Sequence, residues 1–137
     1  MMTYELARQA IYTRLNDAWT VDYPSVPIQW ENRLRVDLFQ QTAPFIGCEV
    51  LFDGAQQASI EYAPIHRYTG SIFLTVFVKE HEGSAVQNTY LTYLTDLFKS
   101  TTFGSVNTKA AVPLPPALFE GWWRKSVAVG FWFDDIP

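Results

Sequence analysis

Few side chains in this sequence have the types and spacing that catalysis or metal binding requires. The histidines are His66 and His81, far apart in the chain, and the one cysteine is Cys48. A zinc site needs three or four ligands at a recognisable spacing, which these three residues do not supply. The apolar neighbours of Cys48 indicate a buried thiol rather than a nucleophile. We therefore expect no metal site and no nucleophilic cysteine.

Other catalytic patterns are weak as well. No serine stands in a nucleophile elbow, and the seven glycines form no phosphate-binding loop. Asp134 and Asp135 are adjacent at the end of the last predicted strand. Paired carboxylates can bind a divalent cation or have a raised pKa, but they also simply solvate a chain end, and we favour that interpretation. The sequence predicts a protein that is not an enzyme and uses no cofactor.

Length and composition predict one folded domain over residues 1–137. The chain has a mass of 15.7 kDa and is 48% hydrophobic and 18% charged, which excludes a disordered segment. Its net charge is −4 with no basic run, which argues against sequence-specific nucleic-acid binding. Because no apolar run is long enough for a signal peptide or a membrane span, we expect a soluble, intracellular protein without a membrane partner.

Aromatic residues are abundant for so small a core. They make up 16% of the chain, and several fall in predicted loops or just before a strand. Such rings either fold back over an open sheet face or anchor a contact with another subunit, where aromatic residues and arginine are enriched. The candidate interface residues are Trp30, Asn32, Arg33, Phe39, Arg67, Tyr68, Trp122, Trp123 and Arg124.

Two helices are expected, at residues 3–18 and 85–99. The first has Thr3 as a plausible N-cap and an apolar stripe at spacings of three and four residues. In the second, Ser84 and Gln87 stand at the spacing of a capping box. Both helices are amphipathic, so each is expected to pack one face on a sheet.

The strands are predicted from alternating apolar residues. Residues 69–79 are apolar on both faces, which is typical of a central strand. A turn is expected at Asp53-Gly54 and an extended loop at 31–44. The order of the elements predicts an α+β fold with a mixed or antiparallel sheet and both helices on one face. The other predicted strands are residues 26–30, 45–52, 58–62 and 125–134, with a proline-stiffened edge segment at 110–116.

The order of these segments resembles that of the tail terminator, or tail completion, proteins of long-tailed bacteriophages. The resemblance covers nearly the whole chain and rests on order and spacing. After Asn32 the sequence departs from the pattern, because RLRV stands where an aromatic or proline-rich stretch is expected. The segments that carry the resemblance are ELARQAIYTRLNDAW, VPIQWEN, TAPFIGCEVLF, RYTGSIFLTVFVKEHEG, YLTYLTDLF and GWWRKSVAVGFWFDD.

This resemblance implies a structural virion protein. Its copies would form a hexameric ring on the head-proximal end of the tail tube, after assembly in the cytoplasm of a bacterial host. The ring would stop polymerisation of the tail tube protein and present a docking surface to the head connector or stopper protein. DNA would pass through the lumen without specific binding, and acidic residues at the lumen would keep it mobile.

Two other functions remain open at this stage. One is another neck component, such as a head–tail joining protein. The other is a small ligand-binding or enzymatic α+β domain that uses a cavity between helices and sheet. The oligomeric mass of the purified protein and the length of tails assembled without it would distinguish these two functions and that of a tail terminator.

Overall fold

Two helices and seven strands make up the described part of the chain. The structure is a computed structural model that describes residues 2–31, 41–60 and 64–135. In chain order the elements are α1 (Tyr4–Asp22), β1 (Ile28–Trp30), β2 (Phe45–Gln57), β3 (His66–Lys79), α2 (Ala85–Phe98), β4 (Thr102–Phe103), β5 (Val106–Pro113), β6 (Ala117–Phe119) and β7 (Trp122–Asp135).

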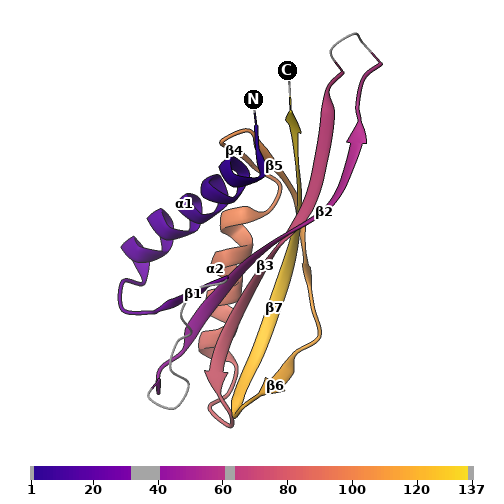
Figure 1. Cartoon of the computed structure of the whole chain (residues 1–137). Helices are drawn as coiled ribbons and strands as arrows, with labels where there is room; N and C mark the ends of the chain where they lie inside the picture. The colour runs from indigo at the N-terminus through magenta and orange to yellow at the C-terminus, as the bar shows by residue number, and fades with distance from the viewer. Residues whose placement is uncertain (1, 32–40, 61–63, 136–137) are drawn as a thin grey trace.

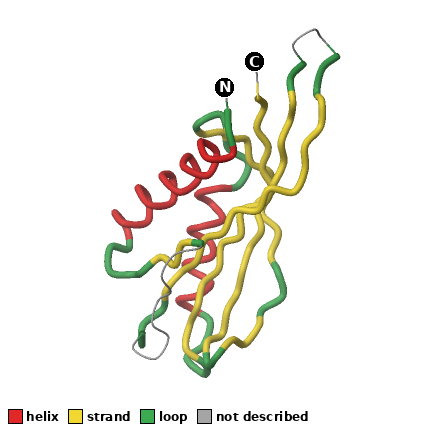
Figure 2. The backbone as a smooth tube through the Cα atoms, viewed as in Figure 1, coloured by secondary structure: helices red, strands yellow, loops and turns green. Residues whose placement is uncertain are grey.

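The strands form one mixed sheet. Their order is β1-β2-β3-β7-β5-β4, and β6 pairs with the beginning of β7. Only β1 and β2 are parallel, and the other pairs within the described residues are antiparallel. Both helices lie on the same side of this sheet (Figures 1 and 2). The predicted α+β fold with two helices on one face is therefore confirmed, and β3 is central, between β2 and β7.

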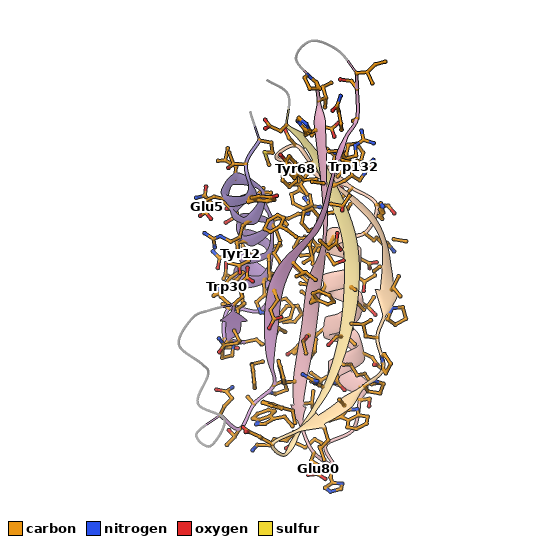
Figure 3. All side chains as sticks on the ribbon, turned by 45° about the vertical axis from the view of Figure 1, so that its right-hand side comes forward. Glu5, Tyr12, Trp30, Tyr68, Glu80 and Trp132 are labelled. Atoms are coloured by element: carbon orange, nitrogen blue, oxygen red, sulfur yellow. The ribbon has the colours of Figure 1, made fainter. Side chains whose placement is uncertain are left out.

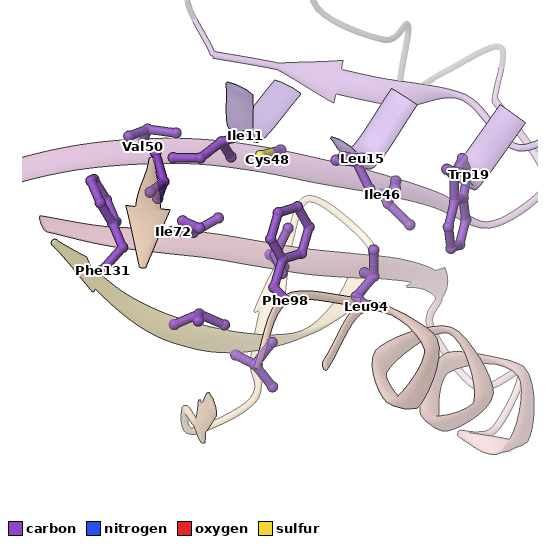
Figure 4. Packing of buried hydrophobic residues seen from close by; sticks show 14 of the residues in the cluster. Ile11, Leu15, Trp19, Ile46, Cys48, Val50, Ile72, Leu94, Phe98 and Phe131 are labelled. Atoms are coloured by element: carbon purple, nitrogen blue, oxygen red, sulfur yellow. The ribbon is translucent and has the colours of Figure 1, made fainter. Parts of the chain in front are cut away.

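The core lies between the helices and one face of the sheet. Alternate residues of β3 are fully buried there, among them Ile72 and Leu74, and β7 contributes Val129 in the same way. Helix α1 contributes four buried residues at helical spacing: Ala7, Ile11, Leu15 and Trp19. Figure 4 shows side chains from α1 meeting those of the sheet and of α2. The alternation read from the sequence correctly grouped the buried residues of β3 and of β7 on one face of each strand.

Helix α1 begins as predicted and ends later. The Thr3 side chain accepts a hydrogen bond from the Leu6 backbone N–H at 3.1 Å, which confirms the N-cap. The helix continues to Asp22, beyond the predicted end at residue 18. The reason is that Trp19 is buried, and its ring lies edge-on to Tyr90 and Tyr93 of α2 at 5.2 and 5.4 Å. This packing stabilises the last helical turn.

The predicted capping box of α2 is wrong. The Ser84 side chain forms no capping hydrogen bond. Gln87 is instead fully buried and points to the sheet, where its Nε2 donates to the backbone oxygens of Val76 at 2.8 Å and Trp123 at 3.0 Å. A glutamine that joins a helix to two strands cannot also turn back to the helix N-terminus.

The hairpin between β2 and β3 is longer than predicted. The sequence predicts a turn at Asp53-Gly54, but β2 continues to Gln57, and the register shift between Phe52 and Gly54 marks a β-bulge. The bulge absorbs the extra residue, and Thr69 Oγ1 donates to Asp53 Oδ1 at 2.9 Å. No strand forms at residues 58–60, so the prediction for 58–62 is wrong there, and 61–63 lie outside the described residues.

Three further strand boundaries differ from the predictions. Strand β3 begins at His66 rather than at 69, and β7 begins at Trp122 rather than at 125, because the two strands pair along their whole length. The first strand is shorter than predicted and begins at Ile28. Part of the predicted loop at 31–44, residues 32–40, lies outside the described residues.

Candidate interaction surfaces

One face of the sheet is not covered by either helix. Side chains alternate across a strand, so the residues between the buried ones on β3 and β7 point away from the helices. We call this surface the open face. The ladder places β2, β3, β7 and β5 side by side across it. Its central members are Gly47, Glu49, Leu51, Ser71, Phe73, Thr75, Ser126, Ala128 and Gly130.

An aromatic cluster fills one end of the open face. Phe45 stacks on Phe77 with ring centroids 4.5 Å apart, and it lies edge-on to Trp122 at 5.0 Å. The ammonium of Lys79 lies 4.6 Å from the centre of the Trp122 ring. Trp122 is fully buried, and its ring N–H has no partner among the described residues. Trp122 is therefore a packing residue of the subunit and offers no exposed ring.

Trp123 and Arg124 follow Trp122 on β7 and are more accessible. Trp123 is half-buried, and its backbone oxygen accepts the hydrogen bond from Gln87. Arg124 is exposed, with its guanidinium carbon 5.8 Å from the centre of the Phe119 ring on β6. Of the three candidates here, these two keep surface that another molecule can contact.

Arg67 is held at the opposite end of the open face. Its Nε and Nη2 donate to the two carboxylate oxygens of Asp134 at 2.8 and 3.0 Å. Its guanidinium carbon lies 4.0 Å from the centre of the Trp132 ring. Tyr68 is the next residue but points to the helix side, where it stacks on Phe133 at 5.3 Å. The candidates Arg67 and Tyr68 therefore belong to opposite faces; Figure 3 labels Tyr68 and the Trp132 ring that Arg67 contacts.

The Arg67–Asp134 pair predicts a loss of stability in acid. The hydrogen bonds from Arg67 lower the pKa of the Asp134 carboxyl. A lowered pKa stabilises the folded state above the ordinary carboxyl pKa, and this contribution is lost as the pH falls through the folded value. Because solvent screens this partly exposed pair, we expect a small contribution. Between neutral and acidic pH, the free energy of unfolding measured with denaturant should fall less in Asp134→Asn than in the parent. Equal falls in the two proteins would contradict this prediction.

Trp30 lies on the helix side, at the end of β1. Its ring packs on Tyr12 of α1 with centroids 4.5 Å apart (Figure 3). The Tyr12 hydroxyl donates to Glu31 Oε1 at 2.7 Å, and Glu31 Oε2 accepts from the Val50 backbone N–H at 3.4 Å. Burial and the neighbouring Glu31 raise the pKa of Tyr12. Trp30 thus joins α1 to the sheet.

The six candidate interface residues that the structure describes do not form one patch. Trp123 and Arg124 remain accessible at the beginning of β7, Trp122 is buried, Arg67 is paired on the open face, and Trp30 and Tyr68 pack toward α1 and the core. Asn32, Arg33 and Phe39 lie outside the described residues.

The sequence interpretation missed four exposed side chains on β2 and β5, the two strands that border the open face. Only the register between strands shows that they lie on this face. They are Glu49 and Leu51 on β2, and Lys109 and Val112 on β5.

The sequence predicted Cys48 correctly. It is 1% exposed, and burial raises the pKa of its thiol, which makes it a poor nucleophile. His66 is exposed at the start of β3, and His81 is exposed beside Glu80. Within the described residues, no group of three or more His, Cys, Asp or Glu side chains could hold a metal ion. No helix in this part of the chain is long and apolar enough to cross a membrane.

An open groove runs along the outer side of α1. It has a volume of about 900 Å³ and is mainly apolar, with Leu6 and Ala10 on one side and Leu97 and Phe103 on the other. Its arginine, Arg14, donates from Nε to the Leu97 backbone oxygen at 2.8 Å and lies over the Phe103 ring at 4.8 Å. The lining also includes Gln9, Thr13, Asp17 and Ser105, so polar groups are present in a groove whose wall is mainly apolar.

Comparison with known proteins adds evidence on the fold. No family model and no curated protein matches the sequence. Several solved structures are similar. One of them matches over 100% of this chain and 99% of its own, with a TM-score of 0.72 and 17% identity. The name of that protein states no activity, ligand or partner. At this level of identity the similarity shows a shared fold.

Proposed function

We propose that this protein is a structural component of a bacteriophage virion, a tail terminator. Its copies form a ring, of six in the family that the sequence resembles, on the head-proximal end of the tail tube. The ring stops addition of tube subunits and presents a docking surface to the head connector. The work is done by shape and binding, without turnover of a substrate.

The observation that carries this proposal is the open face and the two borders that bound it. Within the described residues, helices cover one face of the sheet only, and β1 and β4 pair with only short stretches of β2 and β5, so the other face and the rest of these two borders are available for contacts. The borders differ, since β2 has Glu49 and Leu51 whereas β5 has Lys109 and Val112. Two different surfaces on one subunit allow head-to-tail association, which gives a ring when the rotation closes.

The proposal is tested by tail assembly in the absence of the protein. We expect tail tubes of abnormal, extended length by electron microscopy, because nothing then blocks the growing end. Adding the purified protein to preformed tubes should place a ring at one end and stop their elongation. Tubes of normal length that lack heads would instead indicate a head–tail joining protein and contradict the proposal.

A further inference from the structure

We propose that copies of this chain join through an arm and a groove. In this contact Ile60, near the end of the β2–β3 hairpin of one copy, enters the apolar groove beside α1 of the next copy. The inference rests on the proposed ring and adds a contact between its subunits that lies outside the open face. The sequence interpretation singled out neither half of this contact.

The ends of β2 and β3 form a two-stranded extension, residues 54–60 and 64–69, which we call the arm. Figure 1 shows that it extends past the helices and away from α1. Beyond the last ladder pair, the Ala58 N–H donates to the Ile65 oxygen at 2.6 Å, and the Ile65 N–H donates to Ser59 Oγ at 3.0 Å. The arm is therefore hydrogen-bonded as far as Ser59, which lowers the entropy that it would lose on binding.

Among the large hydrophobic residues that the structure describes, Ile60 is the most exposed. It is 97% exposed, whereas the next, Val21, is 76% exposed. Single exposed aliphatic residues are common on protein surfaces, but the residues that favour turns are Gly, Pro, Asn, Asp and Ser. Local turn chemistry thus gives no reason for an isoleucine here. Burial against an apolar surface of another molecule would favour binding.

The groove beside α1 supplies such a surface. Leu6 and Ala10 line one side, and Leu97 and Phe103 line the other. Leu6 is 46% exposed, so part of this wall is open to solvent. From Leu6 to Ala18 the groove follows α1 for about 18 Å, at 1.5 Å per residue, which is enough for two strands about 5 Å apart. No described residue of the arm lines it, so the arm does not occupy the groove of its own chain.

The two walls of the groove are fixed to each other. The hydrogen bond from Arg14 to the Leu97 oxygen and its position over the Phe103 ring join α1 to the end of α2 and to β4. Gly104 approaches α1 so closely that a Cβ there would lie 2.9 Å from Cβ of Ala10. The groove is therefore formed before anything binds, which lowers the free energy that binding must supply.

The charges of the two surfaces are compatible. Residues 54–60 carry no charge. The groove has one charged lining residue of each sign, Arg14 and Asp17, and Arg14 is held by its own chain. A strongly charged partner such as nucleic acid therefore gains little here, whereas an uncharged arm fits. The other polar lining residues carry amide or hydroxyl groups, as do the glutamines and the serine of the arm: Gln9, Thr13 and Ser105.

A second copy of the chain is the occupant that uses both surfaces. Contact between two arms would leave both grooves empty, and contact between two grooves would leave both Ile60 side chains in water. An arm in the groove of the next copy buries one of each at every junction. Such a heterologous contact repeats from copy to copy and gives a ring when the rotation closes.

Two single variants each remove one half of the contact. Ile60→Asp would place a carboxylate against the apolar wall, which is unfavourable. Thr13→Trp would fill the groove, because Thr13 is exposed and lines it. We expect each to raise the dissociation constant between copies on the order of 100-fold. Sedimentation velocity over a concentration series and negative-stain microscopy on tube ends measure assembly.

The chain offers a matched control for each variant. Val112→Asp introduces the same charge at an aliphatic residue that is 57% exposed on the open face. Asn16→Trp adds the same ring to α1 at an exposed residue that does not line the groove. Both should assemble as the parent does, and so should Ile60→Leu. Circular dichroism and thermal unfolding confirm that every variant is folded.

The decisive measurement mixes the two single variants. Ile60→Asp keeps an intact groove, and Thr13→Trp keeps an intact arm, so one productive junction can form between them. The remaining arm and groove of that pair are both altered, and the pair cannot grow. We expect a 1:1 dimer, and no ring, in the equimolar mixture at concentrations where each variant alone is a monomer.

The outcomes separate this inference from the proposed function. Rings in both single variants would overturn the contact while leaving the tail terminator intact. A mixture that stays monomeric at the highest concentration, or a Thr13→Trp protein that dimerises alone, would also overturn the contact. A parent protein that remains monomeric even on tube ends would overturn both. Normal rings of Ile60→Asp that fail to bind tubes would assign the arm to the tube protein and contradict the contact between copies.

Discussion

Replacing Trp122 by alanine is expected to lower the free energy of unfolding by about 3–5 kcal/mol, the usual cost of removing a fully buried indole. Its ring is 0% exposed, packs edge-on against Phe45 and lies under the Lys79 ammonium. Denaturant unfolding monitored by circular dichroism measures the loss. Trp122→Phe should cost much less, because the ring N–H that it removes has no partner among the described residues.

Trp123 is the natural comparison, because it is adjacent and only half-buried. We expect Trp123→Ala to lower stability by about 1 kcal/mol, which leaves a folded protein whose assembly can be measured. A loss of stability as large in Trp123→Ala as in Trp122→Ala would show that both rings are core residues. A negligible loss in Trp122→Ala would contradict the packing described for the aromatic cluster.

Gly70→Ala is the second change for which a large effect is expected. A Cβ at this position would lie 2.3 Å from the Leu51 backbone oxygen and 2.6 Å from Cζ of Phe131. Neither the central ladder nor a buried ring can move aside easily, and overpacking of this kind costs about 1–3 kcal/mol or more. We expect a loss at the upper end of that range, measured as a lower denaturation midpoint with an unchanged slope.

Gly130→Ala is the matched control, on the neighbouring strand of the same sheet. Its nearest contact would be the flexible Lys109 side chain at 3.5 Å, an ordinary van der Waals distance. Because glycine in a strand is less favourable than alanine, this change should be neutral or slightly stabilising. Equal losses in Gly70→Ala and Gly130→Ala would mean that the close approach of Phe131 does not set the requirement for glycine.

The four apolar residues at alternate positions of the last strand show what a local pattern can predict. Val127, Val129, Phe131 and Phe133 are all buried, as the alternation indicated, and the same holds for the even-numbered residues 72–78 of β3. Helix α1 and its N-cap at Thr3 followed from local spacing in the same way. These features depend on periodicity within one segment, so the sequence contains the information needed to find them.

Features that depend on two segments were not predictable in this way. Asp53-Gly54 is a local turn signal, yet pairing with β3 on one side turned it into a bulge inside a longer hairpin. Ser84 and Gln87 match a capping box, yet Gln87 is bound by two strand carbonyls instead. In both cases hydrogen bonds between distant segments replaced the local turn or cap that the sequence favours.

From the sequence alone, the fold class, the central strand, the buried cysteine and most of the core of this protein could be determined. Only the tertiary structure decided that Trp122 is buried, that Arg67 is held by Asp134, and that an acid and a lysine border one open face. The physical reason is that burial of an alternating pattern is encoded within each strand, whereas the neighbours of a side chain are set by register between strands that are far apart in the chain.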